Sequence, residues 1–221
     1  MDELTPFEFK QCVSIHKSTG KKAGNLRELR NVIAEASEDS IVHHNYQYFQ
    51  KGHMLEYTND FAEWVGESLG EKALAEHLSN IDPYDFKEIG ALRNELLELI
   101  DDYLDKFPRL KESMPGDELY FNETVTLIFP VGIRARNLSE FFAAIKYIEE
   151  DCIYYHFYEA RIRLGRESDD FSRWFEYTLG EKDLAGKIRA VDPLMYSVEQ
   201  IRTFIAGLVE EEVRRDMEVI R

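Results

Sequence analysis

The sequence predicts a mainly α-helical fold, a duplicated helical domain with about five helices and one short strand in each half. Three observations predict it: an internal repeat, apolar residues at helical spacing over most of the chain, and one alternating stretch per half. Homologous halves commonly pack with pseudo-twofold symmetry, and the two strands could then pair as a two-stranded ribbon.

The internal repeat is clearest in two matching segments. DFAEWVGESLGEKALA begins at Asp60, and DFSRWFEYTLGEKDLA begins at Asp170. At an offset of 110 positions, 11 of the 24 residues in 60–83 are identical to their counterparts in 170–193. This period is far longer than the ~20–50 residues of solenoid repeats, and it therefore indicates a duplicated domain.

The repeat also predicts the domain boundaries. We expect a first repeat at 1–107, a linker at 108–119 and a second repeat at 120–221. The linker is placed where Pro108 and Pro115 interrupt any regular element.

Each half begins with a predicted strand. The stretch FEFKQCVSIH starts at Phe7, and YFNETVTLIF starts at Tyr120. Both alternate with a period of two and are rich in aromatic and β-branched residues, a pattern that favours β-structure.

The first two helices of each half follow from capping signals and spacing. Asn25 and Asn137 are each followed three positions later by glutamate, which is typical of a helix N-cap. A second helix is predicted over about 39–51 in one half and about 151–164 in the other.

The third helix of each half lies in the matching segments. Asp60 and Asp170 are its predicted caps, and Gly70 and Gly180 stand where a left-handed C′ residue ends a helix. A short fourth helix follows in each half.

The last helix of each half is predicted to open with a capping box. The candidate boxes are Asp85-x-x-Glu88 and Ser197-x-x-Gln200, and the helices extend to about residues 106 and 220.

Composition limits the possible partners and the compartment. The formal net charge is −16, and an acidic surface repels nucleic acids and anionic membranes, so neither is expected as a partner. No apolar run approaches the ~18–20 residues that cross a bilayer, and the N-terminus lacks a signal-peptide pattern. The two cysteines are expected to be free thiols in a reducing compartment, so we expect a cytoplasmic protein. Neither the cysteines nor the histidines show metal-binding spacing, and we expect no metal and no cofactor.

Two basic turns are candidate anion sites. GKKAGNL contains Lys22, GIRARNL contains Arg134, and each turn precedes a predicted helix N-terminus. Free backbone amides beside a basic side chain can bind an anion. The alternative is a solvated basic turn on an acidic protein.

Two histidines occupy equivalent positions of the repeat. His44 and His156 stand beside aromatic residues, and a histidine can act as base, ligand or hydrogen-bond donor near neutral pH. A buried structural role would also keep a histidine in both halves. Tyr158 and Arg161 follow His156 on the same predicted helix and could line a cleft between the halves, where ligand sites often form.

The second-half run IYYHFYEARIRLG, with DDFSRWFEYTLGEKDLAGKIRAVDP, resembles an uncharacterised prokaryotic family of domains of unknown function, present here as two tandem copies. The resemblance covers nearly the whole chain. It implies no catalytic residues, because no activity is established for that family.

The sequence favours a non-catalytic binding or regulatory module for a small anionic ligand or a partner protein. The expected contacts are Lys22, Arg134, His44, His156, Tyr158 and Arg161. The alternative is an enzyme acting on carbohydrate or phosphate substrates, with a histidine as general acid/base. No nucleophile motif is present, and the sequence gives neither the ligand nor the oligomeric state.

Overall fold

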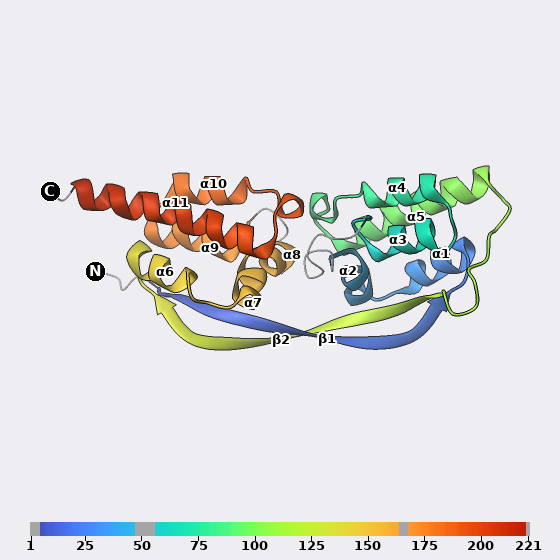
Figure 1. The fold of residues 1–221 in the computed structure, drawn as a ribbon, viewed down its shortest axis with the longest axis horizontal. Coiled ribbons are helices and arrows are strands. Elements are labelled where there is room, and N and C mark those ends of the chain that lie inside the picture. The colour runs from blue at the N-terminus through green and yellow to red at the C-terminus, as the bar shows by residue number, and fades with distance from the viewer. Residues whose placement is uncertain (1–4, 47–55, 164–167, 220–221) are drawn as a thin grey trace. The chain divides into compact units, whose positions relative to one another are not determined.

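The computed structural model describes three stretches of the chain, which are 5–46, 56–163 and 168–219. The chain forms two compact units. Unit 1 contains residues 1–13 and 126–221, and unit 2 contains residues 14–125 (Figure 1). Each unit therefore combines parts of both predicted repeats, and the repeat boundaries stay a prediction about the sequence.

Two long strands run through both units. β1 (Phe7–Ala23) and β2 (Leu119–Ala135) have 17 residues each and form a two-stranded sheet. Their pairing is antiparallel, since the start of β1 lies beside the end of β2, where Arg134 bonds Glu8 at 2.9 Å. Each unit thus includes one stretch of each strand.

These strands overturn the predicted fold class. The structure is 60% helical and 18% strand and has two long strands, so the expected mainly α, duplicated helical domain with one short strand per half is wrong. The strands continue through the two basic turns, because Gly20 and Gly132 adopt positive φ angles of 74° and 76° inside the strands. A left-handed glycine within a strand is typical of a β-bulge, whereas the sequence pattern favoured a turn.

The helices of unit 2 lie between the two strands in the sequence. They are α1 (Leu26–Glu35), α2 (Glu38–Tyr46), α3 (Asp60–Glu67), α4 (Lys72–Ser79), the short 3₁₀ helix η2 (Pro83–Asp85) and α5 (Ile89–Lys106). The second predicted helix, over about 39–51, is helical up to Tyr46, and its predicted end at 47–51 lies outside the described residues.

The helices of unit 1 follow β2 (Figure 1). They are α6 (Leu138–Ile145), α7 (Glu150–Ile153), the π-helical η3 (Tyr154–Glu159), α8 (Ala160–Arg163), α9 (Asp170–Trp174), the π-helical η4 (Phe175–Leu179), α10 (Lys182–Arg189), the 3₁₀ helix η5 (Pro193–Met195) and α11 (Val198–Val219). No helix in the described part of the chain is both long and apolar enough to span a membrane.

The start of each strand is buried under helices that are distant in the sequence. In unit 1, the Phe7 ring contacts Phe141 and Phe171, with ring centroids 5.7 Å and 5.4 Å apart. In unit 2, Phe121 of β2 packs 5.8 Å from Phe61. Burial of a phenylalanine stabilises a fold by about 1.5–3 kcal/mol, so these rings hold the strands to the helices.

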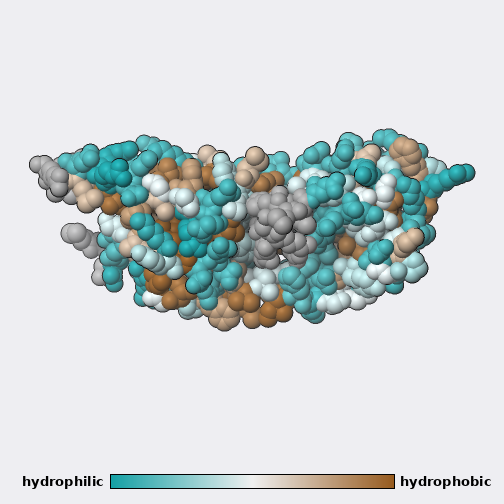
Figure 2. All heavy atoms as spheres, in the orientation of Figure 1, coloured by the Kyte–Doolittle hydropathy of each residue, from teal (hydrophilic) through white to brown (hydrophobic). Residues whose placement is uncertain are grey.

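The rest of the strands is more exposed. The central part of β2 exposes the apolar side chains of Val125, Leu127, Ile128 and Phe129. Figure 2 shows hydrophobic side chains along the strands, while most of the surrounding surface is hydrophilic. The aromatic strand ends, and not the strand centres, therefore anchor the sheet to the two cores.

Several predicted helix ends are confirmed. Asn25 and Asn137 accept the backbone N–H of the residue three positions later, at 3.0 Å and 2.8 Å. Gly70 and Gly180 have the positive φ of a left-handed C-terminal residue, 65° and 80°.

Other helix ends differ from the prediction. The third helices are capped by Asn59 and Asp169, one residue before the predicted Asp60 and Asp170. Asp60 and Asp170 are instead the first residues of their helices, and their carboxylates bond His44 and His156.

The two predicted capping boxes have different outcomes. Ser197 and Gln200 exchange two hydrogen bonds at the start of α11, so that box is confirmed. The other box is wrong, since Asp85 lies in η2 and α5 begins only at Ile89. Asp82 caps η2 and thereby places Asp85 in a separate short turn.

Candidate functional site

A buried histidine joins the first strand to the helices of unit 1. His156 lies on η3, with Nδ1 2.8 Å from Oδ2 of Asp170. Its Nε2 accepts the backbone N–H of Lys10, which is on β1, at 2.8 Å. A backbone N–H can only donate, so Nε2 is unprotonated and Nδ1 carries the proton donated to Asp170. The ring is therefore neutral.

The surroundings of this pair shift both pKa values. Burial lowers the pKa of His156, and the hydrogen bond from its ring to Asp170 only partly opposes this effect. Burial alone would raise the pKa of Asp170, but hydrogen bonds from His156 and Arg163 outweigh it and lower that pKa. The environment thus favours a neutral imidazole beside an ionised carboxylate.

Unit 2 contains a corresponding contact. His44 is buried, with Nδ1 2.9 Å from Oδ2 of Asp60, and its Nε2 accepts the backbone N–H of Asn122 at 3.1 Å. Each histidine therefore bonds a strand at one nitrogen and a helix aspartate at the other. We call each set of His, Asp and strand amide the histidine clamp of its unit.

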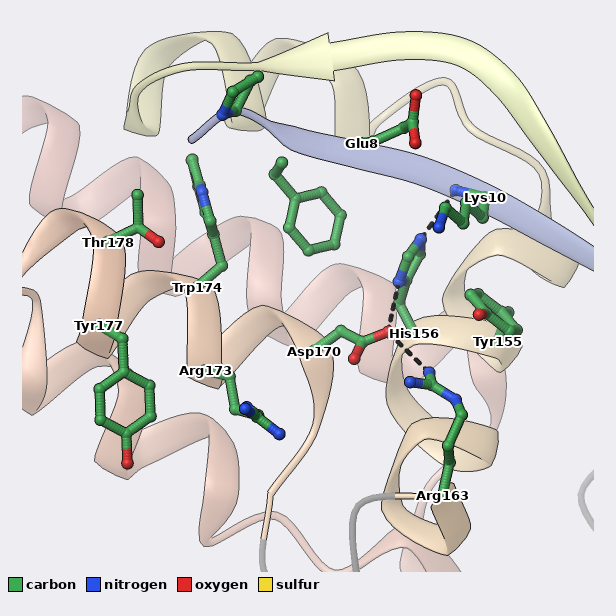
Figure 3. Close-up of a pocket in the computed structure, with 12 residues that line it drawn as sticks. Glu8, Lys10, Tyr155, His156, Arg163, Asp170, Arg173, Trp174, Tyr177 and Thr178 are labelled. Atoms are coloured by element: carbon green, nitrogen blue, oxygen red, sulfur yellow. Dashed lines mark hydrogen bonds and ion pairs between the residues drawn. The ribbon is translucent and has the colours of Figure 1, made fainter. Parts of the chain in front are cut away.

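Unit 1 has an open pocket beside its clamp. The pocket has a volume of about 410 Å³ (Figure 3). Three cations line it from three segments: Lys10 from β1, Arg163 from α8 and Arg173 from α9. Its two acidic side chains are Glu8 and Asp170. We call this the clamp pocket.

The acidic groups of the clamp pocket are already paired. Asp170 accepts from His156 and from Arg163, the latter at 2.9 Å, and Glu8 accepts from Arg134. The Arg163 guanidinium also lies over the Tyr155 ring, 5.0 Å from its centroid. Arg163 is thus both charge-compensated and held in place.

The other two cations of the clamp pocket are uncompensated. Neither the Lys10 ammonium nor the exposed Arg173 guanidinium has a hydrogen bond or ion pair with a residue in the described stretches. Among the described residues, the pocket therefore presents two positive charges without a partner, on a protein whose formal net charge is −16.

The wall of the clamp pocket contains both π-helical segments. Tyr155 and His156 line it from η3, and Tyr177 and Thr178 line it from η4. π-Helical turns are rare and occur frequently at functional sites. Of the matching stretches of unit 2, residues 42–46 lie in α2 and residues 65–67 in α3, and Ser68 and Leu69 follow the end of α3.

The matching positions of unit 2 do not carry these charges. At an offset of 112 the start of β1 aligns with the start of β2, which pairs Lys10 with Asn122, and the offset of 110 pairs Arg173 with Glu63. The two units thus share the clamp, but the positions of Lys10 and Arg173 in unit 1 are taken by a neutral and an acidic residue in unit 2.

The predicted basic pair lies outside the clamp pocket lining. Lys22, in unit 2, pairs with Glu118 at 3.0 Å. Arg134, in unit 1, pairs with Glu8 at 2.9 Å. Both cations are exposed, but each is already compensated by a carboxylate from the neighbouring strand.

The other predicted contacts are buried in unit 1. The Tyr158 hydroxyl donates to the backbone oxygen of Tyr196 at 2.7 Å. Arg161 donates to the backbone oxygens of Ile188 and Arg189 and lies 3.7 Å from the Asp169 carboxylate. Both side chains therefore connect helices of the core, and neither lines the clamp pocket.

One cluster in unit 2 has the ligand types of a metal site. One ligand atom each from His43, His44 and Asp60 lie within 4.8 Å of one another. Both nitrogens of His44 already serve the clamp, and Nδ1 of His43 lies 2.7 Å from the hydroxyl of Thr124. A metal ion bound by His44 would have to replace its bond to Asp60 or its bond to Asn122 of β2, so we assign no metal here.

The cysteines are poor nucleophiles at neutral pH. Cys12 and Cys152 are free and buried in unit 1. Burial raises the pKa of Cys12 to about 12 and that of Cys152 to about 11. Because the thiolate is the reactive form, neither residue provides an activated thiol.

Sequence reasoning missed Lys10 and Arg173. It relied mainly on residues that match between the two halves, such as His44 and His156, whereas Lys10 and Arg173 differ from their counterparts. The contrast between Arg173 and Glu63, inside the best-matched segment, was the available signal. Lys10 could not be placed beside His156, because 146 positions separate them in the sequence.

Comparison with known proteins gives a family and a structural relative. The model of DUF5752, a family of unknown function, matches residues 4–210 as a single copy, so two tandem copies are not shown. The chain is similar to the structure of OrfY from Thermoproteus tenax, with 33% identity and a TM-score of 0.78. That match covers 94% of this chain and 95% of the other. Among curated proteins, none matches the chain.

Proposed function

We propose that this chain, which belongs to the DUF5752 family, is a non-catalytic binding module for a small anionic ligand, and that the clamp pocket is its site. The observation that carries the proposal is the pair of uncompensated cations, Lys10 and Arg173, that line one open pocket. Concave sites with a few convergent polar groups are the usual location of small-ligand binding.

Electrostatics favour an anion at this site. The formal net charge is −16, and the basic side chains of the two predicted turns, Lys22 and Arg134, are paired with carboxylates and offer an anion little net attraction. A cation without a carboxylate partner gains a charge-assisted hydrogen bond when an anion arrives, and such bonds are about twice as strong as neutral ones. The clamp pocket is therefore the favoured position for a negative ligand in unit 1.

The geometry does not support the alternative of a histidine enzyme. A general acid or base must reach the proton that it transfers, directly or through one water. His44 and His156 are 2% and 3% exposed, and both ring nitrogens of each are already hydrogen-bonded. These histidines therefore support the scaffold of the site.

Thermal-shift and calorimetric screening tests the proposal. The probes are inorganic phosphate, glucose 6-phosphate, AMP and citrate, each at equal ionic strength. We expect at least one probe to stabilise the wild type and to bind at one site. The double variant Lys10→Ala/Arg173→Ala should lose this binding.

The matched control for this screen is Lys22→Ala. Lys22 is an exposed cation of unit 2 that pairs with Glu118, so its removal should leave binding unchanged. Equal loss in both variants would indicate non-specific charge attraction. Failure of all four probes to bind the wild type would count against the proposal.

A further inference from the structure

We infer that the ligand of the clamp pocket is a phosphoryl compound carrying about two negative charges, and that its binding locks β1 against the helices of unit 1. The inference rests on the proposed function, because it concerns the same pocket. It adds the chemical class of the ligand and a consequence of binding for the strand.

The charge of the ligand follows from the charges in the pocket. Arg163 is neutralised by Asp170, and Glu8 by Arg134, which leaves the charges of Lys10 and Arg173. A phosphomonoester carries about −1.5 to −2 at pH 7 and offers three acceptor oxygens. A monocarboxylate carries one negative charge and would leave one of the two cations without a counter-charge, so the phosphoryl group is the better match.

The arrangement of donors also suits a phosphoryl group. Figure 3 shows Arg163 and Arg173 on either side of Asp170, with Lys10 beyond His156 on β1. Guanidinium groups present several N–H donors in a fixed plane that matches phosphate oxygens, while an ammonium acts as a compact point charge. The pocket contains both kinds of donor, and its volume of about 410 Å³ leaves room for the remainder of the ligand.

The lock follows from the position of Lys10. Its backbone N–H donates to Nε2 of His156, and its side chain lines the pocket. When β1 opens away from the helices, a ligand held by Lys10 and Arg173 must lose one of them. The binding free energy therefore adds to the free energy of opening the strand, as for any ligand that binds the closed state alone.

Hydrogen exchange of two amides in the same molecule tests the inference. The Lys10 amide bonds His156 in unit 1, and the Asn122 amide bonds His44 in unit 2, where Asn122 and Glu63 stand at the positions of Lys10 and Arg173. Inorganic phosphate at ten times its calorimetric Kd should slow exchange at Lys10 about tenfold, by the factor 1 + [L]/Kd. Asn122 should not change, and acetate at the same ionic strength should protect neither amide.

The possible outcomes separate this inference from the proposed function. If phosphate binds in calorimetry but Lys10 exchanges as before, the lock is wrong and the binding function stands. If acetate protects the Lys10 amide as much as phosphate does, the ligand does not need two negative charges, and the inferred phosphoryl class is wrong. If citrate binds and no phosphoryl probe does, the ligand class is wrong and the binding module survives; if no anion binds, both proposals fail.

Discussion

The two units share the histidine clamp but differ in the side chains that surround it. Each has a histidine clamp, and each has a tryptophan whose Nε1 donates to the backbone oxygen of a residue just before a strand. Trp174 donates to Thr5 at 3.0 Å, and Trp64 donates to Asp117 at 2.6 Å. Around the unit 1 clamp the exposed positions are Arg173 and Tyr177, and in unit 2 the aligned positions are Glu63 and Glu67.

This difference separates structural residues from those proposed to bind. Residues needed to hold a strand on helices are the same in both units, because both perform that task. A ligand site needs only one copy, so its residues are expected among the positions that differ. The histidines matched between halves are accordingly buried supports, while Lys10 and Arg173 have no basic counterpart.

The largest expected effect tests the shared clamp. His156→Phe and His44→Phe should each lower the free energy of unfolding by about 3 kcal/mol. Each substitution leaves a backbone N–H without its acceptor and removes one hydrogen bond from an aspartate, and an unsatisfied buried group costs about 1–3 kcal/mol. Urea unfolding measures the loss. If one variant lowers the free energy of unfolding strongly and the other does not, the two clamps do not have the same role.

The next effect tests the two basic residues of the clamp pocket, Lys10 and Arg173. Replacing the unit 1 residues by those of unit 2, in Lys10→Asn/Arg173→Glu, should weaken phosphate binding about a hundredfold. Loss of each cation removes a charge-assisted bond worth about 1.4 kcal/mol or more, and each 1.4 kcal/mol is a factor of ten. Titration calorimetry measures it, with Glu63→Ala as the control in unit 2. Unchanged affinity in the exchanged variant would place binding elsewhere.

A smaller effect concerns pH. The pKa of His156 in the folded state is lowered below its unfolded value of about 6.5, so its stabilising contribution is complete above that pH and is lost as pH falls through the folded pKa. The pKa of Asp170 is also lowered, so its contribution is present above about pH 3.9 and is lost on further acidification.

We therefore expect the free energy of unfolding to decline as pH is lowered from 7 to 5. His156→Phe should reduce that decline, as the variant lacks the titrating ring. Urea unfolding at several pH values measures both slopes. Identical slopes in wild type and variant would contradict the role given to the neutral imidazole.

The smallest expected effects sharpen the comparison at the helix caps. Asn137→Ala should lower the free energy of unfolding by about 1 kcal/mol, as is usual for loss of an N-cap. Asn25→Ala should cost more, because the Asn25 side chain also donates to the Glu112 carboxylate at 3.1 Å. Equal costs would contradict a contribution from the Glu112 contact. Thermal unfolding by calorimetry is sufficient for both.

Much of the local structure could be predicted from the sequence. The Asn25 and Asn137 caps, the left-handed glycines and the Ser197 capping box depend on neighbours within four residues, and all are present. The long strands could not be predicted, since their extension past Gly20 and Gly132 depends on pairing with a partner about a hundred residues away.

The clamp pocket was harder to predict for the same reason. It needs Lys10 beside His156 and Arg173, and only the docking of β1 on the helices of unit 1 brings them together. The π-helical segments that shape its wall also arise from packing, because the sequence at Tyr154–Glu159 favours an ordinary helix.

Titration of the isotope-labelled protein with inorganic phosphate, followed by amide and side-chain NMR shifts, tests the central claim most directly. The account predicts saturable shifts at Lys10, Arg163 and Arg173, with the aligned groups Asn122 and Glu63 unaffected. Shifts of equal size in both units, or shifts that never saturate, would contradict a ligand site in unit 1 alone.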